Sequence, residues 1–131
     1  MYNISFKNIH VEEFSLSFYL EASIVADDIG KGVTIDDSAA RTVKLAGAGD
    51  RVIGHLSTVE DRTVDGVLVG AVDLKGSFSM AYTGTAPTIG QGVVGSATAG
   101  VLETSGAAAA AGQPIVVYVD AVNETVEALF V

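Results

Sequence analysis

The stretch Gly66–Tyr82, GVLVGAVDLKGSFSMAY, decides the fold prediction because it alternates with a period of two over its whole length. Every second residue from Leu68 to Tyr82 is apolar or Gly, and the residues between them are apolar only until Asp73, where they become polar. A long strand shows this pattern when its first half is covered on both faces and its second half on one. The sequence therefore predicts a long scaffold strand that carries no chemistry of its own.

Two glycines of this strand, Gly70 and Gly76, fall on its apolar face. A missing side chain inside a strand typically marks a bulge, a bend or the close approach of another backbone. We therefore expect a curved sheet rather than a flat one.

Shorter segments with strand-like alternation surround the long strand, and turn residues separate them roughly every eight to twelve positions. Before it, the expected strands are Phe14–Ala22, Val33–Asp36, Thr42–Ala46 and Arg51–Glu60. After it, Ile115–Asp120 and Thr125–Val131 are expected to form a C-terminal β-hairpin. The pattern predicts an all-β fold: a single-domain curved β-sandwich or small β-barrel of short antiparallel strands, with an extended N-terminal arm.

Two segments between the long strand and the hairpin lack a clear strand pattern. Thr88–Gly95 contains only the short pair Val93–Val94 between glycines. Gly106–Pro114, GAAAAAGQP, holds five consecutive Ala, which is too short a run for an isolated helix. We expect no long strand in the first segment and a loop or one helical turn in the second.

The composition indicates one domain with a thin core. The chain has 131 residues, of which 49% are apolar but only 7% aromatic, with no Trp. Ala, Val and Gly dominate, so the core is expected to consist of small side chains. Such a core suits a two-layer sheet, or a protein that gains part of its burial by association with copies of itself.

The charge argues against nucleic acid as a partner. The net charge is -9, and only seven Lys and Arg residues are scattered along the chain, whereas phosphate binding needs clustered cations. No apolar run approaches the ~20 residues that span a membrane, and Met1–Ser5 lacks the basic start of a signal peptide. Cys is absent, which excludes disulfides and thiolate metal sites. We therefore expect neither a nucleic-acid nor a membrane partner.

The first 13 residues are expected to form an arm or an edge strand. Apolar side chains at Tyr2, Ile4 and Phe6 alternate with polar ones, so one side of this segment needs a partner. It is either an edge strand of the chain's own sheet or an arm that adds a strand to a neighbouring subunit. The candidate contacts with another chain are Tyr2, Ile4, Phe6 and Ile9.

The residues that most often perform catalysis are nearly missing. His10 and His55 are the only His, and His55 is interpreted as a structural residue of a strand that is partly exposed or hydrogen-bonded. No Gly-x-Ser-x-Gly elbow occurs, because the nearest match, Gly95-Ser96, lacks the second Gly. We therefore predict no catalytic residue, no cofactor and no enzymatic activity.

Acidic pairs and Gly-rich turns also fail as binding motifs. Asp27-Asp28, Asp36-Asp37 and Glu60-Asp61 lack the spacing of a calcium loop, so turn capping and solvated charge explain them. Asp27 or Asp28 is expected to cap one helical turn that stops at Gly30. Gly30-Lys31-Gly32 lacks the first Gly of a phosphate loop. No metal site is predicted.

A series of short motifs runs through the segment Asp27–Met80. They are Asp28-Ile29-Gly30-Lys31 before Val33-Thr34-Ile35, then Val43-Lys44-Leu45, then Gly49-Asp50-Arg51-Val52-Ile53-Gly54, and finally the strand Val67–Phe78. In phrase and spacing this segment resembles the small head-decoration, or cement, proteins of tailed bacteriophages. A further echo is IGQGVVG, Ile89–Gly95, where Gln91 stands at a position that is often acidic in that family.

The resemblance covers about half of the chain and leaves out the N-terminal arm and the Ala-rich stretch. It implies that residues 14–131 form a β-rich decoration domain that binds the outer surface of an assembled icosahedral capsid. It also implies the major capsid protein as a partner and a homotrimer at three-fold positions, bracing the shell against internal DNA pressure. The protein would be made in the host cytoplasm and carried on the virion.

A second class of function is a non-enzymatic ligand-binding β module, for example one that recognises carbohydrate on a cell surface. Sugar sites generally use exposed aromatic platforms, and this chain has no Trp and only four Tyr. The sequence therefore favours the structural role over the carbohydrate module.

Overall fold

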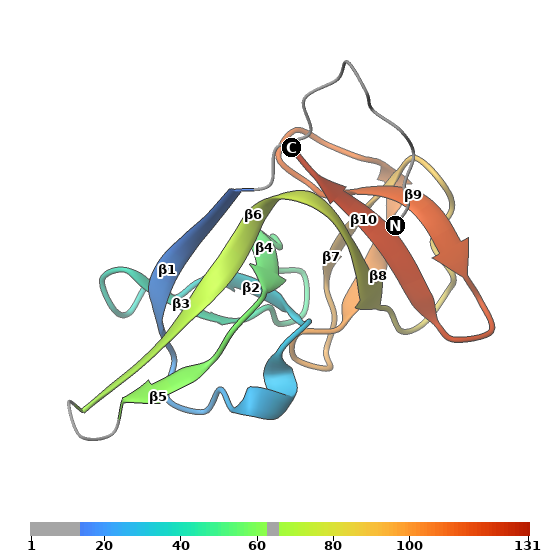
Figure 1. Cartoon of the computed structure of the whole chain (residues 1–131). Helices are drawn as coiled ribbons and strands as arrows, with labels where there is room; N and C mark the ends of the chain where they lie inside the picture. The colour runs from blue at the N-terminus through green and yellow to red at the C-terminus, as the bar shows by residue number, and fades with distance from the viewer. Residues whose placement is uncertain (1–13, 63–65) are drawn as a thin grey trace, which may run out of the picture.

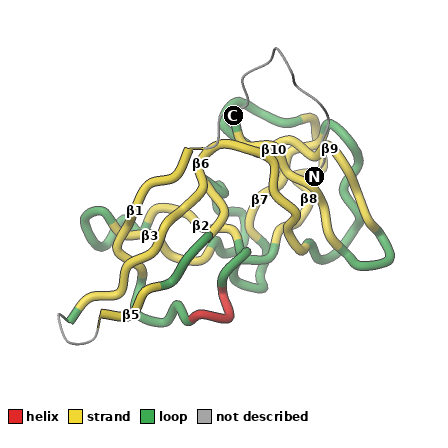
Figure 2. Tube along the Cα trace, in the orientation of Figure 1, coloured by secondary structure: helices red, strands yellow, loops and turns green. Residues whose placement is uncertain are grey.

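The computed structural model describes residues 14–62 and 66–131, which form an all-β fold (Figure 1). The strands are β1 (Phe14–Leu20), β2 (Gly32–Ile35), β3 (Thr42–Leu45), β4 (Gly54–Leu56), β5 (Glu60–Arg62), β6 (Val67–Ala81), β7 (Gln91–Gly95), β8 (Leu102–Ala108), β9 (Ile115–Asp120) and β10 (Thr125–Phe130). The one helical element in these ranges is a 3-10 turn, η1 (Ala26–Asp28), the red segment in Figure 2. None of the helical structure found in the described ranges has the length and apolar character needed to traverse a bilayer.

Five strands close into a small barrel in the order β1-β3-β2-β4-β6, because β1 also pairs with β6. Four of the five pairings are antiparallel, as the sequence predicts. The exception is β1 with β3, which run parallel with Tyr19 opposite Thr42 and Leu20 opposite Val43. The predicted small β-barrel is thus confirmed, and the sheet is mixed rather than purely antiparallel.

The rest of the chain forms a second curved layer, the C-terminal sheet, in the order β6-β10-β9-β7-β8. The predicted hairpin is present as β9 and β10, with Thr125 opposite Asp120. The far edge curls back toward the start, because Tyr82, just beyond β6, bridges Leu102 of β8. The two layers lie side by side in Figure 1, joined by β6.

Strand β6 belongs to both layers and confirms the prediction of one long scaffold strand. Its first half, Val69 to Lys75, pairs with β1, and its second half, Gly76 to Ala81, pairs with β10. Gly76 lies where the partner changes and has a φ of 123°, a region that side chains disfavour. Figure 1 shows β6 arching at this junction, so the expected curvature is confirmed.

The second glycine of β6 serves a close approach rather than a bend. A Cβ atom at Gly70 would collide with the backbone carbonyl oxygen of Thr58. The amides of Ser57 and Thr58 both point to the carbonyl of Ala71, at 2.9 and 3.4 Å, so two residues oppose one. This bulge interrupts the predicted strand Arg51–Glu60, which contains β4 and only the first residue of β5.

Strand β8 corrects the expectation of a loop for the first three residues of the Ala-rich region, whereas residues 109–114 form a loop and turn, as expected. It runs through Gly106 to Ala108, and its residues pair with β7, for example Thr104 opposite Val93. The strand carries small and polar residues because only Leu102 at its start is fully buried. Pairing with a neighbouring strand therefore stabilises a segment whose own sequence has no strand periodicity.

Each layer has its own apolar core. The barrel core consists of aliphatic side chains: Leu20, Ile24, Val33, Val43, Leu56 and Val72. The core of the C-terminal sheet is larger and contains Ala46, Val52, Met80, Tyr82, Val93, Leu102, Val116, Val126, Ala128 and Phe130. The barrel meets this second core at Gly32 of β2, where a Cβ atom would lie 3.0 Å from Val52 and 3.1 Å from Leu102. The absence of a side chain at Gly32 lets the layers pack closely.

Candidate functional site

The predicted contact residues Tyr2, Ile4, Phe6 and Ile9 lie outside the described residues. The chain continues from this segment into strand β1, which begins at Phe14.

Strand β1 keeps an open edge, which we call the β1 edge and define as Phe14–Phe18. One side of β1 pairs with β6 along its length, whereas β3 reaches the other side only at Tyr19 and Leu20. Within the described ranges no strand pairs with the remaining part of that side. The β1 edge thus exposes backbone hydrogen-bonding groups, and such an edge is a template for strand addition.

Apolar side chains accompany this open edge. Leu16 lies opposite Val72, which is fully buried, so both point to the interior side of the barrel. Leu16 is nevertheless 45% exposed, and Phe14 is 47% exposed. These two side chains form a short apolar seam on the interior side of β1, at the start of the strand.

A polar cluster ties β1 to the barrel at the same place. The Ser15 hydroxyl donates to Asp73 Oδ1 at 2.5 Å, and His55 Nδ1 lies 3.1 Å from Asp73 Oδ2. The three residues come from β1, β4 and β6. The His55 ring also stacks on Phe78, with ring centroids 4.6 Å apart. His55 is thus hydrogen-bonded, which is one of the two structural settings that the sequence left open for it.

The order of contacts in this cluster differs from that of a nucleophilic triad. A Ser–His–Asp triad needs the imidazole between the hydroxyl and the carboxylate, so that it can accept the hydroxyl proton. Here Asp73 stands in the middle and contacts both partners. The cluster therefore fixes three strands, and it satisfies a carboxylate that is only 8% exposed. The sequence placed Asp73 on a polar face and did not predict its burial.

Asp28 and Asp36 accept hydrogen bonds within local turns, as predicted, whereas the third pair, Glu60-Asp61, lies in strand β5. Burial opposes the ionisation of Asp28, but hydrogen bonds from Lys31 and from the Val25 amide outweigh it, so the pKa of Asp28 lies below its usual value. Hydrogen bonds from the Ser38 hydroxyl and amide lower the pKa of Asp36. The Asp28 carboxylate accepts a hydrogen bond from the Val25 amide, at the residue that precedes η1. Among the residues described, no three His, Asp or Glu gather closely enough to hold a metal ion.

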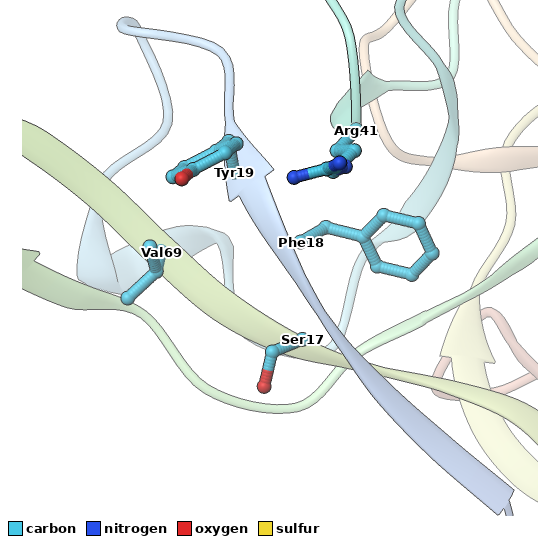
Figure 3. Close-up of a pocket in the computed structure, with 5 residues that line it drawn as sticks. All are labelled: Ser17, Phe18, Tyr19, Arg41 and Val69. Carbon is cyan, nitrogen blue, oxygen red and sulfur yellow. The ribbon is translucent and has the colours of Figure 1, made fainter.

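A shallow cavity opens on the outer face of the barrel, beyond the covered end of β1 (Figure 3). It has a volume of about 250 Å³ and is lined by Ser17, Phe18, Tyr19, Arg41 and Val69. It combines one cation, two aromatic rings and two hydroxyl groups. The sequence analysis did not single out any of these residues as a site.

Comparison with known proteins adds no assignment to this geometry. The chain matches no protein-family model and no curated protein. The case for a function therefore depends on the sequence motifs and on the features described above.

Proposed function

We propose that the protein is a structural protein of a tailed-bacteriophage virion that binds the outer surface of the assembled capsid and stabilises the shell as a homotrimer. The motifs of Asp27–Met80 motivate this proposal. The observation that carries it is the β1 edge, an unpaired strand edge with half-exposed apolar side chains at the point where the arm joins the body. Strand edges of this kind bind extended segments of other chains.

Attachment would use two adjoining parts of the chain. The arm residues Tyr2, Ile4, Phe6 and Ile9 would contact the major capsid protein or a sister subunit, and the β1 edge would accept an extended segment of the partner. Ser15 and Asp73 would keep the β1 edge rigid against the barrel, so that little ordering is needed on binding. Each contact is small, but many copies on one shell would add their effects through multivalency.

Cosedimentation with capsids that lack the protein tests this proposal. The wild type should sediment with the shells, and a variant without residues 2–9 should lose most of its binding while its body stays folded. Leu16→Lys should also weaken binding, because it places a charge in the apolar seam. Val117→Lys is the matched control, since Val117 is 39% exposed on β9, in the other layer.

Light scattering on the purified protein, and on the protein released from dissociated shells, measures the mass of the assembly. A homotrimer should have three times the mass of one chain. Normal binding by both the truncated protein and Leu16→Lys would contradict the proposed attachment. Failure of the wild type to bind shells, together with binding to immobilised glycans, would instead favour the carbohydrate module.

A further inference from the structure

Arg41 has an unusual backbone conformation for its residue type. Its φ is 57°, and the only other described non-glycine residue with a positive φ is Glu124, in the β9–β10 turn. Long side chains disfavour this left-handed region, and Gly or Asn would occupy it at lower cost. Strain of this kind is a reason to ask what the side chain does. At Arg41 the side chain lines the cavity on the outer face of the barrel.

The neighbouring strands hold Arg41 in place. The Tyr19 amide donates to the Arg41 carbonyl oxygen at 2.9 Å, and the next residue, Thr42, pairs with Tyr19 in the parallel ladder. Tyr19 lies opposite Val69 on β6, so these two side chains share one face, and Ser17 lies two residues earlier on the same face. Figure 3 shows the guanidinium group directed toward Tyr19, with Phe18 close by.

No carboxylate of residues 14–62 or 66–131 pairs with the guanidinium group of Arg41. It forms no ion pair with any residue in the described ranges, although the chain has 16 acidic residues and only seven Lys and Arg. None of the residues that line the cavity is acidic. Glu60 lies opposite Val69 on the far side of β6, about two strand spacings, or roughly 10 Å, from Tyr19. The cavity is therefore a locally cationic site on an acidic protein.

We propose that this cavity binds a carboxylate group carried on an apolar body. Arg41 would bind the two carboxylate oxygens through its planar fork of N–H donors, a geometry that suits carboxylates. The Ser17 hydroxyl would donate a further hydrogen bond, and Tyr19 and Val69 would contact the apolar body. A free carboxylic acid and an acidic side chain of a bound protein present the same chemistry, so either could occupy the site. The proposal therefore does not depend on the proposed capsid role.

Titrations followed by amide NMR on the full chain test the site with three small probes. N-acetyl-L-leucine presents a carboxylate on an apolar body, N-acetyl-L-leucinamide is its neutral counterpart, and acetyl-Leu-Glu-Leu-amide presents a side-chain carboxylate. Both carboxylates should shift the amides of Ser17, Tyr19, Arg41 and Val69 in a saturable way. The affinity for the neutral amide should be lower by a factor on the order of ten or more, since the amide lacks the charged hydrogen-bond acceptor. The tighter of the two carboxylates identifies the source.

Variants separate binding from folding. Arg41→Gln should lose about tenfold or more in affinity for both carboxylates. Arg51→Gln is the matched control, because the Arg51 side chain donates to the Gly112 carbonyl oxygen elsewhere, and it should bind as the wild type does. Arg41→Asn should also lose binding but fold at least as well, since Asn tolerates the left-handed region.

Three results would overturn the proposal. They are equal binding of the acid and its amide, unchanged binding by a folded Arg41→Gln or Arg41→Asn protein, and larger shifts at these four amides with methyl glucoside than with either carboxylate.

Discussion

The barrel and the C-terminal sheet complete themselves in different ways. The barrel closes by continuous backbone pairing of β1 with β6, reinforced by Ser15 and Asp73, around a core of Leu, Ile and Val. The C-terminal sheet comes back on itself through the single bridge of Tyr82 and Leu102, around a larger core that includes Met80 and Phe130. Backbone pairing therefore dominates the closure of one layer and side-chain packing that of the other. Four matched pairs of substitutions test this difference.

The largest effects are expected for the two fully buried leucines, Leu56 in the barrel and Leu102 in the C-terminal sheet. Changing either to Ala should lower the free energy of unfolding by about 2–5 kcal/mol, through lost burial and a residual cavity. Leu102→Ala should cost more, because Leu102 also packs over Gly32 of the barrel. Urea unfolding followed by circular dichroism measures both values. Two separate transitions in either variant would show that the layers unfold independently, contrary to the shared packing.

The next effects are expected at two glycines that face backbone oxygens. A Cβ atom would collide with the Thr58 carbonyl oxygen at Gly70 in the barrel, and with the Gly47 carbonyl oxygen at Gly95 in the C-terminal sheet. Ala at either position should cost about 1–3 kcal/mol, because the backbone must shift. Hydrogen exchange should show lost protection around β5 and β6 in Gly70→Ala and around β7 in Gly95→Ala. Unchanged stability of both variants would contradict the close approaches.

A smaller difference is expected between two serines that donate to carboxylates. The bond from Ser15 to Asp73 is partly buried, whereas the bond from Ser77 to Glu127, at 2.7 Å, is exposed. Ser15→Ala should cost about 1–2 kcal/mol, because it leaves a buried charged acceptor short of a donor. Ser77→Ala should stay within about 0.5 kcal/mol of the wild type. Thermal unfolding at neutral pH compares the two variants. Equal losses of stability would contradict the stabilisation of β1 by the hydrogen bond from Ser15 to Asp73.

The smallest effects are expected from two carboxylates with lowered pKa values, Asp28 in the barrel and Asp120 in the C-terminal hairpin. Hydrogen bonds from the Asn123 side chain and amide lower the pKa of Asp120. A lowered folded-state pKa stabilises the protein above the usual carboxyl pKa of about 4, and this stability is lost as the pH falls through the folded value. Asp28→Asn should therefore lower the free energy of unfolding by up to about 1 kcal/mol at pH 7, a small effect because Lys31 is partly exposed to solvent. At pH 2 the substitution should have no effect, because the carboxylate is then protonated. Asp120→Asn should cost less.

Unfolding titrations between pH 2 and pH 7 measure this dependence. A stability difference between Asp28→Asn and the wild type that persists unchanged at pH 2 would contradict the assignment to ionisation.

Local pattern was enough to predict the elements that bury one regular face. The alternation in β6 gave its length, its two faces and its curvature, and the hairpin β9–β10 was evident from two apolar runs around a turn. Strand β8 was missed because Gly106 and its Ala neighbours carry no apolar period, and only pairing with β7 makes them a strand. The break between β4 and β5 was missed because it depends on the distant carbonyl of Ala71.

The candidate sites were less accessible to sequence reasoning, since their residues meet only in the fold. Asp73 lies 58 residues from Ser15 and 18 from His55, so its burial has no local signal. Arg41 stands in a turn where its left-handed backbone would have been suggested only by Gly or Asn. The open edge of β1 follows from β3 being short, which the length of β1 itself does not reveal.

The shared strand β6 also determines when the two sheets can form during synthesis on the ribosome. The first described strand emerges early, yet its closing partner is made about 58 residues later, a delay of several seconds at roughly 5–20 residues per second. During that interval the apolar side of β1 has no barrel to enter, and neither layer can be completed until β6 has left the exit tunnel. Nascent chains stalled before β6 should therefore be the species that chaperones hold.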